Sequence, residues 1–245
     1  MKTTSKNALA DPAKKRILLL AFSIFWLGGC AATNVQQIDR LESIGENPRI
    51  LLMPPDIKYY LLTAGGVPEP NAEWTEAAQQ NFGEAVSNYA TSIGTNLKLV
   101  DKRNLSPVEI QYEELHAAVG FTIINNYFGY SKLPSKNGRF DWSLGPEIRE
   151  IGEQHDADYA LFVHYRDYQA SGGRVAFAIL AAAAGGAASI GSESGFASLV
   201  DLRTGDIVWF NVVTAGSGEL RKKEGAATAV AALFKDIPTN TAPEE

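Results

Sequence analysis

The chain has 245 residues, a single cysteine and a formal net charge of −6. Cleavage after residue 29 would remove five positive charges and one negative charge and leave −10, a balance that excludes the clustered Lys and Arg of a nucleic-acid-binding protein. The single cysteine excludes an intramolecular disulfide, so packing must stabilise the fold.

Residues 1–29 have the pattern of a secretory signal peptide. Four lysines and one arginine occur among the first 16 residues, and residues 17–29 are uncharged and mostly apolar. This run is shorter than the roughly 20 residues that a membrane-spanning helix needs, so a cleaved signal is a better interpretation than a permanent anchor. The small pair Gly28-Gly29 provides the cleavage site.

The residues around the cysteine, Leu27, Gly28, Gly29 and Cys30, resemble the lipobox of bacterial lipoproteins. The resemblance implies that the Cys30 thiol is lipidated, with palmitate among the acyl chains, and that Cys30 becomes the first residue of the mature chain. Ala31 in the second mature position implies sorting to the outer membrane, with the domain in the periplasm. The alternative is an unmodified cysteine in an uncleaved anchor.

The mature chain is predicted to form one domain. Residues 30–48 are polar and lack a regular hydrophobic period, which predicts a tether between the lipid and a domain over 49–238. The apolar run 50–53 predicts a buried strand that ends at two prolines, and the Gly- and Pro-rich residues 63–71 predict a loop. Residues 239–245 are expected to be a flexible tail.

Helices are predicted mainly in the first half of the domain. Apolar residues recur every three or four positions over 72–94 and predict a helix capped by Asn71. Ser106 and Glu109 form a capping box, and the helix that follows continues to about residue 128. The predicted apolar stripe of this second helix is Leu115, Val119, Ile123 and Tyr127. Two further helices are predicted over 146–154 and 222–235.

Strands are predicted mainly in the second half. Residues 159–168 are apolar on both faces in their first half and predict a central strand. Strands at 196–202 and 207–213 are joined by a turn in which Gly205 can take the left-handed conformation, which predicts a hairpin. With a short strand at 97–100, the pattern predicts an α/β fold, a sandwich of helices on a mixed or antiparallel sheet.

An apolar, Ala- and Gly-rich insertion over 172–195 separates two predicted strands. A transmembrane helix is disfavoured because Ala, Gly and Ser contribute little to insertion. A membrane hairpin of two ten-residue arms is disfavoured because the required alternation holds in only one arm. A short apolar helix over 175–184, ended by Gly185, is favoured. Its predicted membrane or subunit contacts are Val175, Phe177, Ile179 and Leu180.

Residues that could carry chemistry form no catalytic pattern. His116, His155 and His164 lack the three- or four-residue spacing of a helical metal pair, and the acids after His155 fit a helix end equally well. A segment with the spacing of a nucleophile elbow has Glu193 where serine is required. The sequence therefore predicts no catalytic residue, no metal site and no cofactor.

Three motifs, at 53–56, 63–75 and 195–211, resemble a family of proteobacterial outer-membrane lipoproteins over about 49–238. That family is distantly similar to the curli secretion-channel lipoprotein and to the exopolysaccharide-export ring lipoprotein. The resemblance implies a non-catalytic scaffold or accessory factor in cell-envelope assembly or secretion, with homo-oligomers or envelope proteins as partners. The alternatives are an oligomeric export-pore subunit and an envelope hydrolase.

Overall fold

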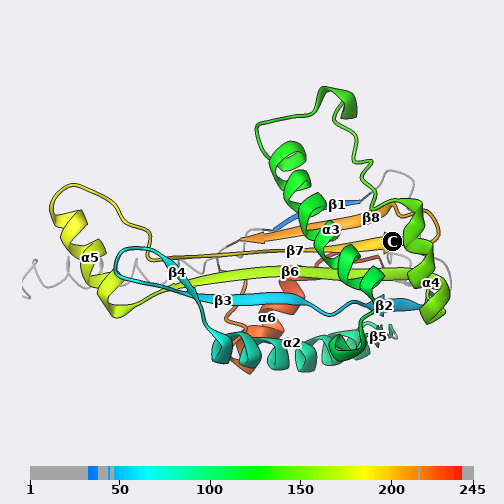
Figure 1. Ribbon diagram of the computed structural model, residues 1–245, viewed down its shortest axis with the longest axis horizontal. Coiled ribbons are helices and arrows are strands. Elements are labelled where there is room, and N and C mark those ends of the chain that lie inside the picture. The colour runs from blue at the N-terminus through cyan, green and yellow to red at the C-terminus, as the bar shows by residue number, and fades with distance from the viewer. Residues whose placement is uncertain (1–32, 38–43, 45–46, 96, 215, 239–245) are drawn as a thin grey trace, which may run out of the picture. The chain divides into compact units, whose positions relative to one another are not determined.

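Figure 1 shows the computed structural model of the chain. The structure describes residues 33–37, 44, 47–95, 97–214 and 216–238. The chain divides into two units, 1–30 and 31–245, and every described residue belongs to the second. The predicted signal peptide and Cys30 lie outside the described residues and stay predictions.

Eight strands form one mixed sheet. They are β1 (Thr33–Gln37), β2 (Ile50–Leu52), β3 (Asp56–Leu62), β4 (Pro68–Pro70), β5 (Leu97–Leu99), β6 (Tyr159–Ala170), β7 (Gly191–Asp201) and β8 (Ile207–Thr214). Their order is β1-β8-β7-β6-β2-β5, and β3 pairs with both β6 and β4. β2 is parallel to β5 and β6, β3 is parallel to β6, and the other pairs are antiparallel. This arrangement confirms the predicted helices on a mixed sheet.

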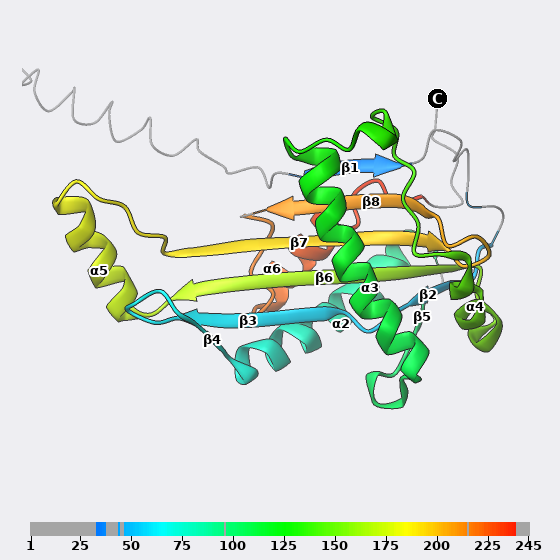
Figure 2. The same ribbon diagram turned by 45° about the horizontal axis from the view of Figure 1, so that its top comes forward.

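The helices lie on both faces of the sheet. They are α2 (Ala72–Ser92), α3 (Pro107–Ile123), α4 (Arg149–His155), α5 (Gly172–Ala183) and α6 (Lys223–Leu233), with shorter turns at Lys102–Asn104, Ile124–Phe128, Pro134–Lys136 and Pro146–Ile148. α2 and α6 cover one face, and α3 crosses the other (Figures 1 and 2). The predicted caps are confirmed: the Asn71 side chain accepts from the Trp74 N–H, and Ser106 and Glu109 form a capping box.

The first strand corrects the predicted tether. Thr33–Gln37 pairs with β8 at the edge of the sheet, and Ile44 is buried in the core beneath α2 and α6. The sheet therefore begins 16 residues before Arg49, where the domain was expected to start. β1 has a mostly polar sequence and is held in place by backbone hydrogen bonds to β8. Its sequence therefore lacks the apolar period by which a strand is recognised.

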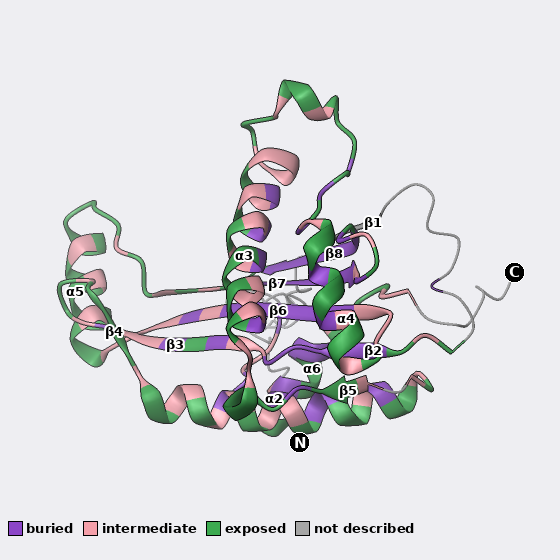
Figure 3. Ribbon diagram, turned by 45° about the vertical axis from the view of Figure 1, so that its right-hand side comes forward, coloured by how far each residue is buried: buried purple, intermediate pink, exposed green. Residues whose placement is uncertain are grey.

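β6 is the central strand, as predicted, and separates two apolar cores. Its alternate residues Leu161 and Val163 pack with α2 and α6, whereas Ala160 and Phe162 face the side that α3 and α4 cover. Figure 3 shows buried residues concentrated in the central strands. A strand that is buried on both faces has no polar side, which accounts for the nearly continuous apolar sequence of the first half of β6.

The buried face of α3 differs from the predicted stripe. Leu115 is exposed, while His116 and Gly120 are buried together with Ile123. A Cβ atom on Gly120 would lie 2.1 Å from Cε2 of Phe196, so the missing side chain lets α3 approach the sheet closely. The inward face of α3 is therefore partly polar, so the positions of its apolar residues alone do not identify it.

The predicted hairpin between β7 and β8 is confirmed. Gly205 has a φ of +80°, a value that L-residues rarely adopt, and its N–H donates to the Asp201 carbonyl at 2.8 Å. The register of the hairpin aligns Gly195 with Val213.

Candidate functional site

The surface that best fits an interaction site is at one end of the sheet. α5 connects the end of β6 to the start of β7 and lies next to the β3–β4 turn (Figures 1 and 2). The Ser171 N–H donates to the Leu62 carbonyl at 2.9 Å and fixes the turn beside the helix. We call α5, the loop 184–190 and the turn 63–67 the arm tip.

The sequence of α5 explains where the helix begins and ends. The Ser171 hydroxyl accepts from the Arg174 N–H at 3.2 Å and begins the helix, and alanine and leucine then favour helical backbone. Gly185, with a φ of +80°, ends it. The favoured helical interpretation of the insertion is confirmed with the helix starting three residues earlier than expected, and the hairpin alternative is wrong for its first arm.

The arm tip is apolar and exposed. α5 has no buried residue, and the chain carries no charge from 175 to 192. The exposed fractions of its large apolar residues are 40% for Val175, 50% for Phe177, 65% for Ile179 and 70% for Leu180. None of the described helices has both the length and the apolar character that crossing a bilayer requires. An exposed apolar segment of this kind is typical of an interaction site.

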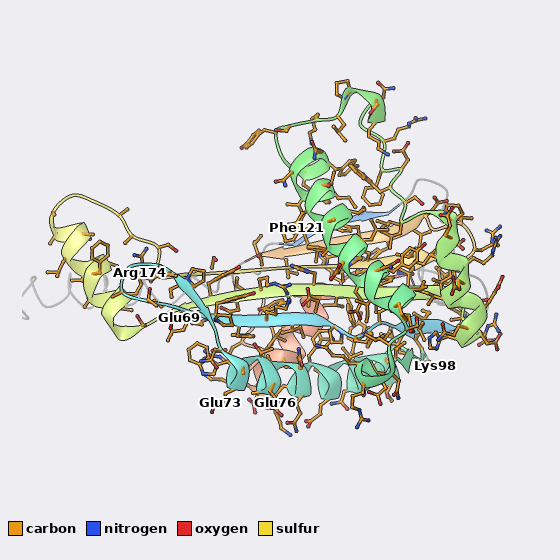
Figure 4. All side chains as sticks on the ribbon, in the orientation of Figure 1. Glu69, Glu73, Glu76, Lys98, Phe121 and Arg174 are labelled. Carbon is orange, nitrogen blue, oxygen red and sulfur yellow. The ribbon has the colours of Figure 1, made fainter. Side chains whose placement is uncertain are left out.

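Arg174 holds the arm tip together. Its Nε donates to the Ser189 carbonyl at 2.9 Å, and its guanidinium carbon lies 5.6 Å from the ring centre of Phe177. A Cβ atom on Gly66 would lie 3.0 Å from the guanidinium, which therefore rests on the β3–β4 turn. Figure 4 shows Arg174 at the base of α5, beside β4. One cation thus connects the helix, the loop after it and the turn.

Replacing Arg174 by Ala is expected to loosen the arm tip without unfolding the domain. The Ser189 carbonyl and the Phe177 ring lose their partner, so amide hydrogen exchange in 184–190 should become faster. The global free energy of unfolding should change by less than about 0.5 kcal/mol. Arg203→Ala, which removes an exposed arginine from the β7–β8 turn, is the control; equal exchange in both variants would contradict the role of Arg174.

The histidines occupy structural positions. His116 Nε2 lies 2.7 Å from the Ser198 hydroxyl, and complete burial lowers the pKa of His116 to about 3. His155 Nε2 lies 2.6 Å from Glu109 Oε1 and joins the end of α4 to the start of α3. His164 stacks on a neighbouring ring of the core. Over the described part of the chain, no group of three or more His, Cys, Asp or Glu residues could hold a metal ion.

A groove of about 360 Å³ lies between α3 and the start of β3. Asp56 and Arg166 form an ion pair at 2.5 Å on one side of it. On the other side, the pKa of Glu113 is raised to about 7, mainly by burial and also by the charges of Asp56 and Glu109, against the opposing effect of Lys102. The residues that line the groove include no Ser, Thr, Cys or Tyr, so the groove offers a proton-holding carboxyl group without a hydroxyl or thiol nucleophile beside it.

Two carboxylates face each other across neighbouring strands on the opposite face of the sheet. Asp167 on β6 and Glu193 on β7 are register partners, and Asp167 is only 2% exposed. Glu193 accepts a hydrogen bond from the Ser217 N–H at 3.1 Å and another from its hydroxyl. Burial raises the pKa of Asp167 to about 6, against the effect of a hydrogen bond from Gln169.

Sequence reasoning missed Glu113 and Asp167. Both occupy positions whose periodicity points inward: Glu113 lies three residues before the buried His116 on α3, and Asp167 alternates with the buried Tyr165 on β6. An acid at an inward position of a helix or strand is the pattern that identifies such residues. The burial of each acid depends on the packing of its helix or strand against the rest of the fold, which a short window of sequence does not show.

No protein-family model matches the chain, and no curated protein matches it in sequence. Among solved structures, the chain is similar to a PelC dodecamer from Paraburkholderia phytofirmans, at 9% identity and a TM-score of 0.38, over 83% of this chain and 97% of that one. It is similar to lipoprotein GNA1162 from Neisseria meningitidis at 14% identity and a TM-score of 0.30, over 68% and 81%. The LpoB C-terminal domain from Salmonella enterica is similar at 13% identity and a TM-score of 0.28, over 71% and 88%. Because these TM-scores lie below 0.5, the function proposed for this chain rests on its own residues.

Proposed function

We propose that the protein is a lipid-anchored accessory protein of the bacterial cell envelope, held on the periplasmic face of the outer membrane through Cys30, and that it acts as a scaffold by binding. The observation that carries the proposal is α5, an apolar helix that buries none of its residues. Keeping such a surface in water costs free energy, and a partner that covers it recovers that cost. The lipobox pattern at 27–30 supports the anchor.

A scaffold also needs protein partners, either further copies of this chain or other envelope proteins. α3 also carries exposed apolar side chains, since Ile110, Leu115 and Phe121 are 40–47% exposed. Figure 4 labels Phe121 on this helix, far from Arg174 at the arm tip. Exposed apolar side chains at two separate places on one domain support a role in joining components.

Cys30→Ala is expected to abolish palmitate labelling of the protein. The thiol is the group that would carry the acyl chains, and the variant also loses the lipobox and so keeps the apolar run 17–29, which makes the label and not membrane association the informative result. Isolation of the protein from cells grown with radiolabelled palmitate measures the label. A variant that still takes up label, or a wild-type protein that takes up none, would contradict the proposed anchor.

Ala31→Asp is the matched control for location. By resemblance to bacterial lipoprotein sorting, it should keep the palmitate label and move from the outer to the inner membrane fraction. The two variants together separate the presence of the lipid from the membrane that receives it.

A further inference from the structure

The chain enters the sheet beside the half of β7 that is nearer α5. β1 is antiparallel to β8, and β8 is antiparallel to β7, so β1 and β7 run in the same direction. Figure 2 shows β1 and β7 pointing the same way, with β7 starting beside α5 and β1 starting partway along β7. Thr33 is aligned through Val213 with Gly195, only four positions from Gly191, where β7 begins after the arm tip.

The distances along the chain and the sheet are short. Three residues lead from Cys30 to Thr33, and an extended chain of that length reaches about 10 Å. Four strand positions from Gly195 to Gly191 span about 13 Å, and β1 and β7 are two strand spacings, or about 10 Å, apart. The start of β7 thus lies about 16 Å from Thr33, and a lipid on Cys30 would hold the half of the sheet nearer the arm tip close to the membrane.

The chemistry of α5 fits a lipid surface. Its only side chain with a charge or a hydrogen-bonding group is Arg174, at the end nearest the sheet, so the helix has no polar face to direct toward water. Twelve residues make a helix of about 18 Å, which is shorter than the roughly 30 Å of a hydrocarbon core. Such a helix can lie within the interfacial region, where a cation at its base can contact lipid phosphates.

We propose that α5 inserts into the leaflet that holds the lipid on Cys30, as a second membrane contact beside the anchor. The inference rests on the proposed function, because the anchor keeps the arm tip at a high effective concentration near the bilayer. The lipid and the helix then contact the same surface at two points. Two contacts restrict the rotation of the domain that a single flexible anchor would allow.

Fluorescence quenching by lipids tests this insertion. Ile179→Cys would be labelled with an environment-sensitive dye in the full lipidated chain, in which the Cys30 sulfur is already a thioether and cannot react. The protein is bound to vesicles of phosphatidylethanolamine and phosphatidylglycerol that contain nitroxide-labelled acyl chains. We expect the emission at position 179 to shift to the blue and to fall by roughly half or more, as a side chain at the acyl boundary should.

Leu99→Cys is the matched control. Leu99 is 59% exposed, close to the 65% of Ile179, and its register through Leu52 to Leu161 places it at the opposite end of β6 from the arm tip. Figure 4 shows the neighbouring Lys98 far from Arg174. A dye at position 99 should show neither the shift nor the quenching.

The outcomes separate this inference from the proposed function. A protein that does not float with the vesicles overturns both the lipid anchor and the insertion. A protein that floats with an unshifted, unquenched dye at position 179 overturns the insertion and leaves the anchor standing. A blue-shifted dye that the lipid does not quench overturns it as well, because α5 is then covered by a second copy of the chain.

Discussion

Gly120→Ala is expected to destabilise the protein by about 2–3 kcal/mol. The added Cβ would lie 2.1 Å from Cε2 and 2.5 Å from Cζ of Phe196, well inside van der Waals contact. Phe196 cannot move aside, because its ring is buried and stacks against His164 and Phe210. To relieve this clash with Phe196, α3 must move away from the sheet. That movement would also increase the distance between His116 Nε2 and the Ser198 hydroxyl.

Gly83→Ala is the control for this prediction. Gly83 also lies within a helix, but nothing lies within 4 Å of a Cβ at that position. Alanine favours helical backbone over glycine by about 1 kcal/mol, so this variant should be more stable than the wild type. Urea unfolding of both variants measures the difference, and a change of the same sign in both would refute the close packing of α3 on β7.

Asp167→Asn is expected to stabilise the protein at pH 8 by about 2 kcal/mol. Burial, together with the nearby carboxylates of Glu193 and Glu219, raises the pKa of Asp167 from its ordinary value of 3.8 to about 6. The folded state therefore binds this proton more tightly than the unfolded chain. The cost of the buried charge is present above pH 6 and is relieved as the pH falls toward 4.

The stability profile from pH 8 to pH 4 tests the role of Asp167. In the wild type, this group makes the free energy of unfolding rise as the pH falls through 6, and Asn should remove that part of the slope because it carries no charge. Tyr59 and Arg221 lie in the same cluster and keep their protonation state over this range. An unchanged slope in Asp167→Asn would refute the prediction.

Asp158→Asn is a control of opposite sign. The guanidinium of Arg49 donates to Asp158 and holds the pKa of that carboxyl below its ordinary value. Ionised Asp158 therefore stabilises the folded state, and its replacement should lower stability at pH 8. The two aspartates differ in their surroundings, one buried among acids and the other exposed beside an arginine.

Local chemistry was sufficient to predict several elements. The Asn71 cap, the capping box of Ser106 and Glu109, and the left-handed turn at Gly205 each depend on residues within four positions of one another. The end of α5 at Gly185 is of the same kind. In each case the sequence carries the hydrogen-bond partner or the glycine that the backbone needs, so a short window of sequence is enough.

Other features depend on distant partners and could not be predicted in this way. His116 and Ser198 are 82 positions apart, and Glu109 and His155 are 46 apart, yet these pairs make the inward face of α3 polar. The pairing of Asp167 with Glu193 follows from the register of β6 and β7, which no local pattern determines. The exposed surface of α5 was predicted because an uncharged run is visible without any partner.

The pairing of β1 with β8 also determines when the fold can be completed. Thr33 and Val213 are 180 positions apart, and closing a loop of that length costs about 5 kcal/mol of chain entropy. Contacts between residues so far apart form late in folding, after the shorter-range pairs have formed. If the chain is exported from its amino end, as the proposed function requires, the edge of the sheet would stay open until the last strand has crossed the inner membrane. The first strand to leave the cytoplasm would then be the last to find its neighbour, which would leave the residues before it accessible to processing enzymes in the meantime.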